Sequence, residues 1–194
     1  MNKMNVRRLT GLAVFTAVVV VLQFLGSFVR FGVFSVSLVL IPIVVGAALY
    51  GRAAGAWLGF VFGVVVLLSG DAAAFLTVNA PGTVLVVLLK GTLAGFCAGV
   101  AYRLLARLNT WAGVIFSAIV CPVVNTGIFL LGCLIFFMPT ITGWAESFGF
   151  PSAANYMVFG LAGGNFLFEV LFNLVLSPVI LRVIRIGQKA GAKA

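Results

Sequence analysis

The chain has 194 residues, of which 63% are hydrophobic and only 8% are charged, and its formal net charge is +9. A soluble domain is about 45 to 50% apolar and about 25% charged, so this composition excludes an ordinary water-soluble fold. The apolar runs lack the alternating polarity of a β-barrel, which leaves an all-α integral membrane protein, and the basic charge fits membrane loops better than a nucleic-acid partner.

The hydropathy pattern predicts one membrane domain, residues 1–194, folded as a six-transmembrane-helix bundle at about 20 residues per crossing. The predicted spans are residues 9–28, 34–50, 53–68, 83–102, 111–137 and 157–181. A tight turn joins the second and third spans, and Pro81 suits the start of the fourth. Pro122 predicts a kink in the fifth span, and residues 138–156 form the longest loop.

Basic residues gather at the span ends that would face one side of the membrane. With the amino terminus inside, ten of the twelve Lys and Arg residues lie on the cytoplasmic side: Lys3, Arg7, Arg8, Arg52, Arg103, Arg107, Arg182, Arg185, Lys189 and Lys193. Among the loops, only Arg30 places a cation outside. The positive-inside rule therefore predicts that both termini are cytoplasmic in a multi-pass protein of the plasma membrane.

Glycines recur at intervals of four on two predicted helices, which brings them onto one face of each. They are Gly51, Gly55, Gly59 and Gly63 around the third span, and Gly91, Gly95 and Gly99 on the fourth. Such faces let membrane helices approach closely, so we expect packing inside the bundle in preference to partner docking. Ala13 and Ala17 form a shorter version of this pattern on the first span.

Two charged residues, Lys90 and Glu169, fall near the middle of apolar spans, where insertion of a charge costs about 2.5 to 3.5 kcal/mol. Asn125, Asn165 and Asn173 add amides at membrane depth, and the last two share a helix face with Glu169. Two interpretations stay open. Lys90 and Glu169 form an ion pair bridged by the amides, or these residues line a small-molecule cavity.

The residue inventory disfavours catalysis. The sequence has no histidine, which excludes Ser-His nucleophiles and His-based zinc sites, and its three acids do not cluster as metal ligands. It also lacks a P-loop, so no ATP site, cofactor or metal is predicted. The inventory leaves open an ion-coupled carrier or channel that uses Glu169 and Lys90, and a small intramembrane enzyme.

The ordered pattern resembles the substrate-binding subunits, or S components, of energy-coupling factor (ECF) vitamin transporters. The resemblance spans nearly the full chain and rests on the order of several degenerate features. These are a basic start, Ala13 with Ala17, the stretch 40–51 (LIPIVVGAALYG), Gly55 to Gly63, the segment 90–102 that opens KGTLAG, and Asn125-Thr126 with Phe129.

The resemblance implies a six-helix protein, itself no enzyme, that captures a vitamin-type ligand from outside. It would work with a transmembrane coupling subunit and two ATPase subunits, docked through Ala13 and Ala17. Ligand would bind near the outer membrane half, and depth and chemistry select the candidate contacts: Lys90, Asn125, Asn165, Glu169, Asn79, Arg30 and Trp144. An acid such as pantothenate and a flat ring such as riboflavin or a queuosine-type base both suit this set.

Overall fold

The computed structural model describes residues 3–27, 30–31, 34–35 and 38–192. Its helices are α1 (Lys3–Ser27), α2 (Leu40–Tyr50), α3 (Arg52–Leu68), α4 (Ala73–Leu76), α5 (Ala80–Leu105), α6 (Thr110–Phe136), α7 (Met138–Ser147), α8 (Ala153–Asn155), the π-helix η1 (Tyr156–Gly163), α9 (Gly164–Val175) and α10 (Ser177–Ala192). Strands β1 (Arg30–Phe31) and β2 (Phe34–Ser35) form a two-residue antiparallel pair. Apart from this pair, the described residues confirm the predicted helical fold.

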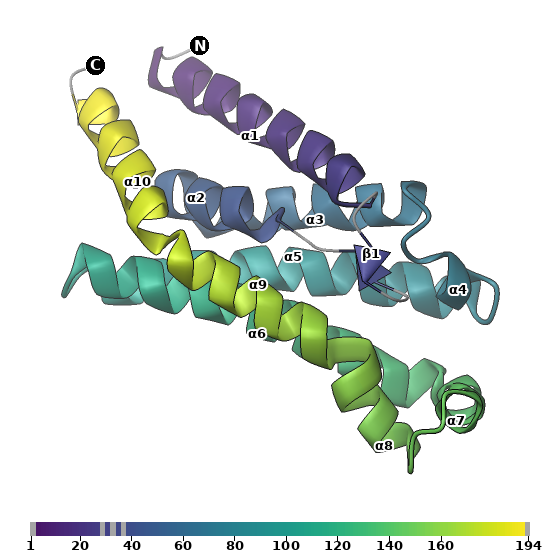
Figure 1. Ribbon diagram of the computed structural model, residues 1–194. Helices are drawn as coiled ribbons and strands as arrows, with labels where there is room; N and C mark the ends of the chain where they lie inside the picture. Colours follow the sequence, from purple (N-terminus) through teal and green to yellow (C-terminus); the bar gives the residue numbers. More distant parts are fainter. Residues whose placement is uncertain (1–2, 28–29, 32–33, 36–37, 193–194) are drawn as a thin grey trace.

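The long helices run back and forth along one bundle, as Figure 1 shows. One end of the bundle contains the start of α1, the end of α10 and the turns α2–α3 and α5–α6. We call it the basic end because it carries Arg8, Arg52, Arg103 and Arg107. The β1–β2 pair, α4 and α7 lie at the other end, which we call the aromatic end. These four arginines share one end of the bundle, and the side of the membrane that this end faces stays a prediction.

Four helices in the described part of the chain are long and apolar enough to cross a membrane: Val6–Ser27, Ala80–Leu105, Thr110–Phe136 and Ala153–Val175. The predicted second and third spans correspond to α2 and α3, which have only 11 and 17 residues. At 1.5 Å per residue α3 is about 25 Å long, slightly short of a hydrocarbon core of about 30 Å. Six crossings therefore stay a prediction.

Two predicted boundaries differ clearly from the structure. The second span was expected from residue 34, but α2 begins at Leu40 because residues 34–35 pair with β1. The last span was expected to continue to residue 181, but α9 ends at Val175 and α10 begins at Ser177. Pro178 has no N–H to donate to the preceding turn, and the first turn of a new helix is where that missing donor costs least.

Contact between α3 and α5 follows the predicted glycine faces. Gly55 faces Gly95, and Gly59 faces Gly91, so closely that a Cβ on any of them would collide with the opposite carbonyl group. Between membrane helices, close van der Waals packing replaces the hydrophobic effect as the driving force. The prediction that these four glycines pack inside the bundle is confirmed, whereas it was wrong for Gly51, which lies exposed in the α2–α3 turn with positive φ and no neighbour within 4 Å of a built Cβ.

We expect Gly59→Ala to destabilise the protein, because the new methyl group meets the backbone of Gly91, which cannot rotate away. Overpacking costs about 1–3 kcal/mol, or a fall in Tm of roughly 2 to 12 °C at this chain length. Gly127→Ala on α6 is the matched control, because a Cβ there meets nothing within 4 Å. The measurement is the Tm of each variant in detergent. An equal change in Tm for both variants would contradict this packing.

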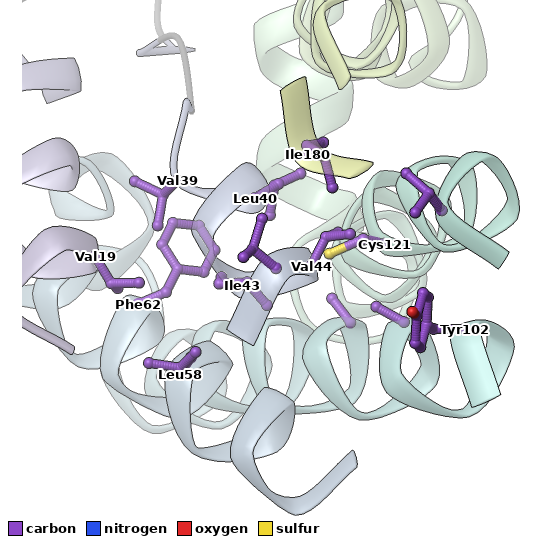
Figure 2. Packing of buried hydrophobic residues seen from close by; sticks show 14 of the residues in the cluster. Val19, Val39, Leu40, Ile43, Val44, Leu58, Phe62, Tyr102, Cys121 and Ile180 are labelled. Atoms are coloured by element: carbon purple, nitrogen blue, oxygen red, sulfur yellow. The ribbon is translucent and has the colours of Figure 1, made fainter. Parts of the chain in front are cut away.

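The main hydrophobic core lies where α2 is surrounded by its neighbours. Figure 2 shows Leu40, Ile43 and Val44 of α2 close to Val19 of α1, Leu58 of α3 and Ile180 of α10. A second cluster at the aromatic end joins α4, α6, α7 and η1 through Phe75, Phe137, Ile141 and Tyr156. Much of the segment that was predicted as a long loop, residues 138–147, is thus the packed helix α7. Between the two clusters lies the polar cavity described next.

Candidate functional site

A cavity opens among α1, α3, α4, α5, α6 and α9, and the space free of atoms within it, mouth included, is about 700 Å³. Its polar lining comes from Gln23, Asp71, Thr83, Lys90, Asn125, Asn165 and Glu169. Its aromatic lining comes from Phe62, Phe75, Phe129 and Phe137. Four of the residues predicted as ligand contacts therefore meet in one place: Lys90, Asn125, Asn165 and Glu169.

Lys90 projects from the middle of α5 between two aromatic rings. Its Nζ lies 5.8 Å from the ring centre of Phe62 on α3 and 5.3 Å from that of Phe129 on α6. Both distances are within the range of cation–π attraction, which offsets part of the free-energy cost of removing the ammonium group from water. The α3 face that carries Phe62 is held close by the paired glycines, so tight packing of α3 on α5 positions this ring.

Glu169 lies on α9, opposite Lys90, and is only 2% exposed. Its Oε1 accepts a hydrogen bond from Asn165 Nδ2 at 3.1 Å, as their separation of four residues on one helix predicts. Among the described residues, no salt bridge within 4.0 Å joins Glu169 to Lys90, and Glu169 Oε2 and Asn125 Oδ1 are buried without a hydrogen-bond partner. The predicted ion pair is therefore not formed, whereas the shared cavity is.

Gln23 is one of three polar cavity residues, with Asp71 and Thr83, that sequence reasoning did not name as ligand contacts. Its Nε2 donates to Asp71 Oδ2 at 2.7 Å, and Ser69 Oγ donates to the same oxygen at 3.1 Å. The other amide atom, Gln23 Oε1, is buried without a partner among the described residues. In the sequence, the signal that could have identified Gln23 is a polar amide within an otherwise apolar span. Its role depends on α1 meeting the turn after α3, which no local pattern reveals.

The aromatic end closes over the cavity through Phe75 of α4. Its ring lies 5.6 Å from that of Phe129, 5.1 Å from that of Phe137 and 5.4 Å from that of Trp144, all with edge-to-face geometry. Trp144, a predicted ligand contact on α7, therefore supports the wall without being part of the lining. Aromatic pairs of this kind contribute about 0.5–1.5 kcal/mol beyond burial, so the cover is well packed.

The remaining predicted contacts lie elsewhere. Asn79 Oδ1 accepts from Gly82 N at 3.0 Å and caps the amino terminus of α5, ahead of Pro81 in its first turn. The backbone of Arg30 pairs with Ser35 in the β1–β2 pair, and its side chain lies outside the described residues. Asn173 is buried on α9 but does not line the cavity.

Ala13 and Ala17 lie on the exposed face of α1. Their neighbours on that face are the exposed Val14, Val18 and Val21, so the surface is apolar with a shallow strip of small residues. The inner face of α1 is fixed to α3, where Trp57 Nε1 donates to Thr16 Oγ1 at 3.1 Å. The small residues are thus available to another helix, unlike the glycines of α3 and α5.

The lining of the cavity combines charged and neutral hydrogen-bonding groups. It offers one ammonium group and three buried acceptor oxygens, on Gln23, Asn125 and Glu169, without partners among the described residues. Leaving such groups unpaired costs about 1–3 kcal/mol each, and a ligand with matching groups recovers it. In the described part of the chain, no three His, Cys, Asp or Glu side chains come together as metal ligands.

Comparison with known proteins agrees with this picture. A family model described as "ECF transporter, substrate-specific component" matches residues 7–181. Among solved structures, ThiT from Listeria monocytogenes has a similar fold, with a TM-score of 0.72 and 21% sequence identity over 96% of this chain and 98% of that chain. No curated protein matches the sequence at a significant level. At 21% identity the structural match concerns the fold alone, whereas the family match extends over most of the chain.

Proposed function

The chain belongs to the substrate-specific components of ECF transporters, and we propose that it captures a vitamin or related micronutrient in the cavity around Lys90 and Glu169. Ligand would enter from the aromatic end, taken as the outer side of the plasma membrane. A transmembrane coupling subunit and two ATPase subunits would then drive import. The family is a transporter component and not an enzyme, in agreement with the sequence.

One observation carries this proposal. Lys90 and Glu169 line the same cavity and are not paired with each other, although each costs energy at membrane depth. A purely structural pair would be expected to close to hydrogen-bonding distance, because that contact repays part of the desolvation. Two opposite charges held apart around an open space instead support a ligand that lies between them.

The polar lining constrains what that ligand presents. The Lys90 ammonium has no hydrogen bond to an acceptor among the described residues, so a carboxylate or another strong acceptor suits it. The three orphan acceptor oxygens suit N–H or O–H donors on the other side of the molecule. The rings of Phe62, Phe75 and Phe129 provide apolar contact for a flat or aliphatic body. We therefore propose a compact ligand that carries both an acceptor group and several donors.

Partner docking is proposed for the exposed strip of Ala13 and Ala17 on α1. Small residues on a lipid-facing helix let a second helix approach closely enough for van der Waals contact and weak Cα–H hydrogen bonds. Their exposure supports this role, because the monomer leaves the strip uncovered. Gln23 lies on the same helix, so the helix that would meet the partner also contributes to the cavity wall.

Co-purification tests the proposed function. We expect the tagged protein, isolated from its own cells in mild detergent, to bring down a coupling subunit and two ATPase subunits, and ligand uptake in proteoliposomes to require ATP. Uptake that persists without any ATPase and collapses with an ion gradient would contradict the proposal. That outcome would favour the ion-coupled carrier based on Glu169.

A further inference from the structure

A second cavity lies at the basic end, bounded by the start of α1, the α2–α3 turn, the end of α5 and the α5–α6 turn. It is open, with about 1120 Å³ of space free of atoms, mouth included. Four arginines from these separate segments line it: Arg8, Arg52, Arg103 and Arg107. Arg103 is 13 residues from Lys90 along α5, or about 20 Å at 1.5 Å per residue, so this arginine cavity is distinct from the ligand cavity.

No carboxylate side chain in the described part of the molecule balances the arginine cavity. The sequence contains only three acids, and they lie in the turn after α3 (Asp71), in α7 (Glu146) and in α9 (Glu169). Two of the arginines have neutral partners: Arg8 donates to the backbone oxygen of Tyr50, and Arg52 lies 5.8 Å from the ring centre of Phe96. These contacts orient the guanidinium groups but leave the positive charge uncompensated.

Backbone dipoles leave this balance unchanged. The amino-terminal ends of α3 and α6 and the carboxyl-terminal ends of α2 and α5 meet at this cavity, so partial positive and partial negative charges both lie along its wall. The amino terminus of α6 is also capped, because Asn109 Oδ1 accepts a hydrogen bond from Trp111 N at 2.9 Å. The positive potential therefore comes from the arginine side chains.

The surface beside the cavity is apolar and faces outward. On and next to the α5–α6 turn, Leu104 is 62% exposed, Leu108 is 84% exposed and Trp111 is 37% exposed. Exposed leucines next to a tryptophan at a helix end are typical of chain that lies at the boundary between headgroups and acyl chains. The arginines therefore lie next to apolar surface suited to the headgroup boundary of the bilayer, where the headgroup of an anionic lipid can reach them.

We propose that the arginine cavity binds the phosphate group of an anionic phospholipid. The planar guanidinium groups of Arg103 and Arg107 donate hydrogen bonds to the phosphate oxygens in bidentate fashion, and the lipid tails extend from there toward the middle of the bilayer. The positive-inside rule alone does not explain the cavity. That rule places basic residues on one side of the membrane but does not require arginines from four segments to converge. Arg182 and Arg185 of α10 carry the same charge and do not line it.

Those two arginines provide a matched control. Purified protein in uncharged detergent is titrated with dioctanoyl phosphatidylglycerol, dioctanoyl phosphatidylcholine or inorganic phosphate, and bound molecules are counted by native mass spectrometry. We expect the wild type to bind the anionic lipid about tenfold more tightly than the zwitterionic one. Arg103→Gln with Arg107→Gln should abolish this preference, whereas Arg182→Gln with Arg185→Gln should retain it.

Equal binding of the two lipids by the wild type, or equal loss in both double variants, would overturn the proposal. Displacement of the anionic lipid by millimolar phosphate would keep the phosphate site but overturn its assignment to lipid. If the cavity variant unfolds, Arg103→Lys replaces it, because lysine keeps the charge and loses the bidentate geometry. Its lipid preference should still fall, and an unchanged preference would count against bidentate binding.

Discussion

Replacing Ala13 and Ala17 together by leucine is expected to stop uptake while leaving ligand binding intact. Both side chains lie on the exposed face of α1, so the larger residues meet no neighbour inside the monomer. Against a partner helix, however, each leucine adds three carbon atoms to a strip that has to be shallow for close approach. Co-purification of the coupling subunit should fall to background, and the variant should still carry its ligand.

The matched control is Ala13→Ser with Ala17→Ser, which keeps the strip narrow and should retain both co-purification and uptake. The serine variant changes the chemistry of the two positions but keeps them small, so the comparison shows whether side-chain size is what docking requires. Unchanged uptake in the leucine variant would refute docking at this strip. Loss of ligand binding in that variant would instead indicate a distorted α1, through the contact of Gln23 with Asp71.

Neutralising either cavity charge is the second change with a large expected effect. Lys90→Gln removes the ammonium that we assign to an acceptor of the ligand, and Glu169→Gln replaces one carboxylate oxygen by an N–H donor. Hydrogen bonds to charged groups contribute about 1.5–3 kcal/mol, so each variant should bind ligand roughly 10- to 150-fold more weakly. Equilibrium titration with the ligand that co-purifies measures this directly.

Thr92→Val on α5 is the control for these variants. Thr92 lies two residues from Lys90, its hydroxyl donates only to the backbone oxygen of Leu88 at 2.7 Å, and it does not line the cavity. The Thr92→Val variant should bind ligand with the same affinity as the wild type. The Tm of every variant should be measured in parallel. Normal affinity in both charge variants would return Lys90 and Glu169 to a structural role.

The sequence predicted the centre of the cavity well because depth can be counted along an apolar helix. Lys90 and Glu169 were placed at a similar depth from the helix ends, and the four-residue spacing put Asn165 beside Glu169. The packing faces of α3 and α5 were equally predictable, because small residues at intervals of four in a membrane helix typically mark a close helix–helix contact.

The aromatic wall and the α1 side of the cavity could not be predicted in this way. Phe75 of α4 meets both Phe137, at the junction of α6 and α7, and Trp144 of α7, and a single apolar residue in a sequence does not indicate its partner. The contact of Gln23 with Asp71 joins residues 48 positions apart, so it depends on how α1 lies against α3. Asn79 was assigned to the ligand because it is polar, whereas the structure shows it as the cap of α5.

The end of the chain shows another limit of pattern reading. Between Glu169 and Arg182 only Asn173 and Ser177 are polar, so hydropathy alone predicts one long span from α9 into α10. Pro178 was present in the sequence as a helix breaker, but a proline within an apolar run also fits a kink, as expected for Pro122. In the structure α6 continues through Pro122, whereas the chain forms two helices around Leu176.

The central claim is that a small molecule binds between Lys90 and Glu169, and native mass spectrometry of the freshly purified protein tests it most directly. The wild type should carry one small molecule per chain, whose mass identifies it, and Thr92→Val should carry the same molecule. Lys90→Gln and Glu169→Gln should lose most of it while remaining folded. Full occupancy in both charge variants would contradict the claim.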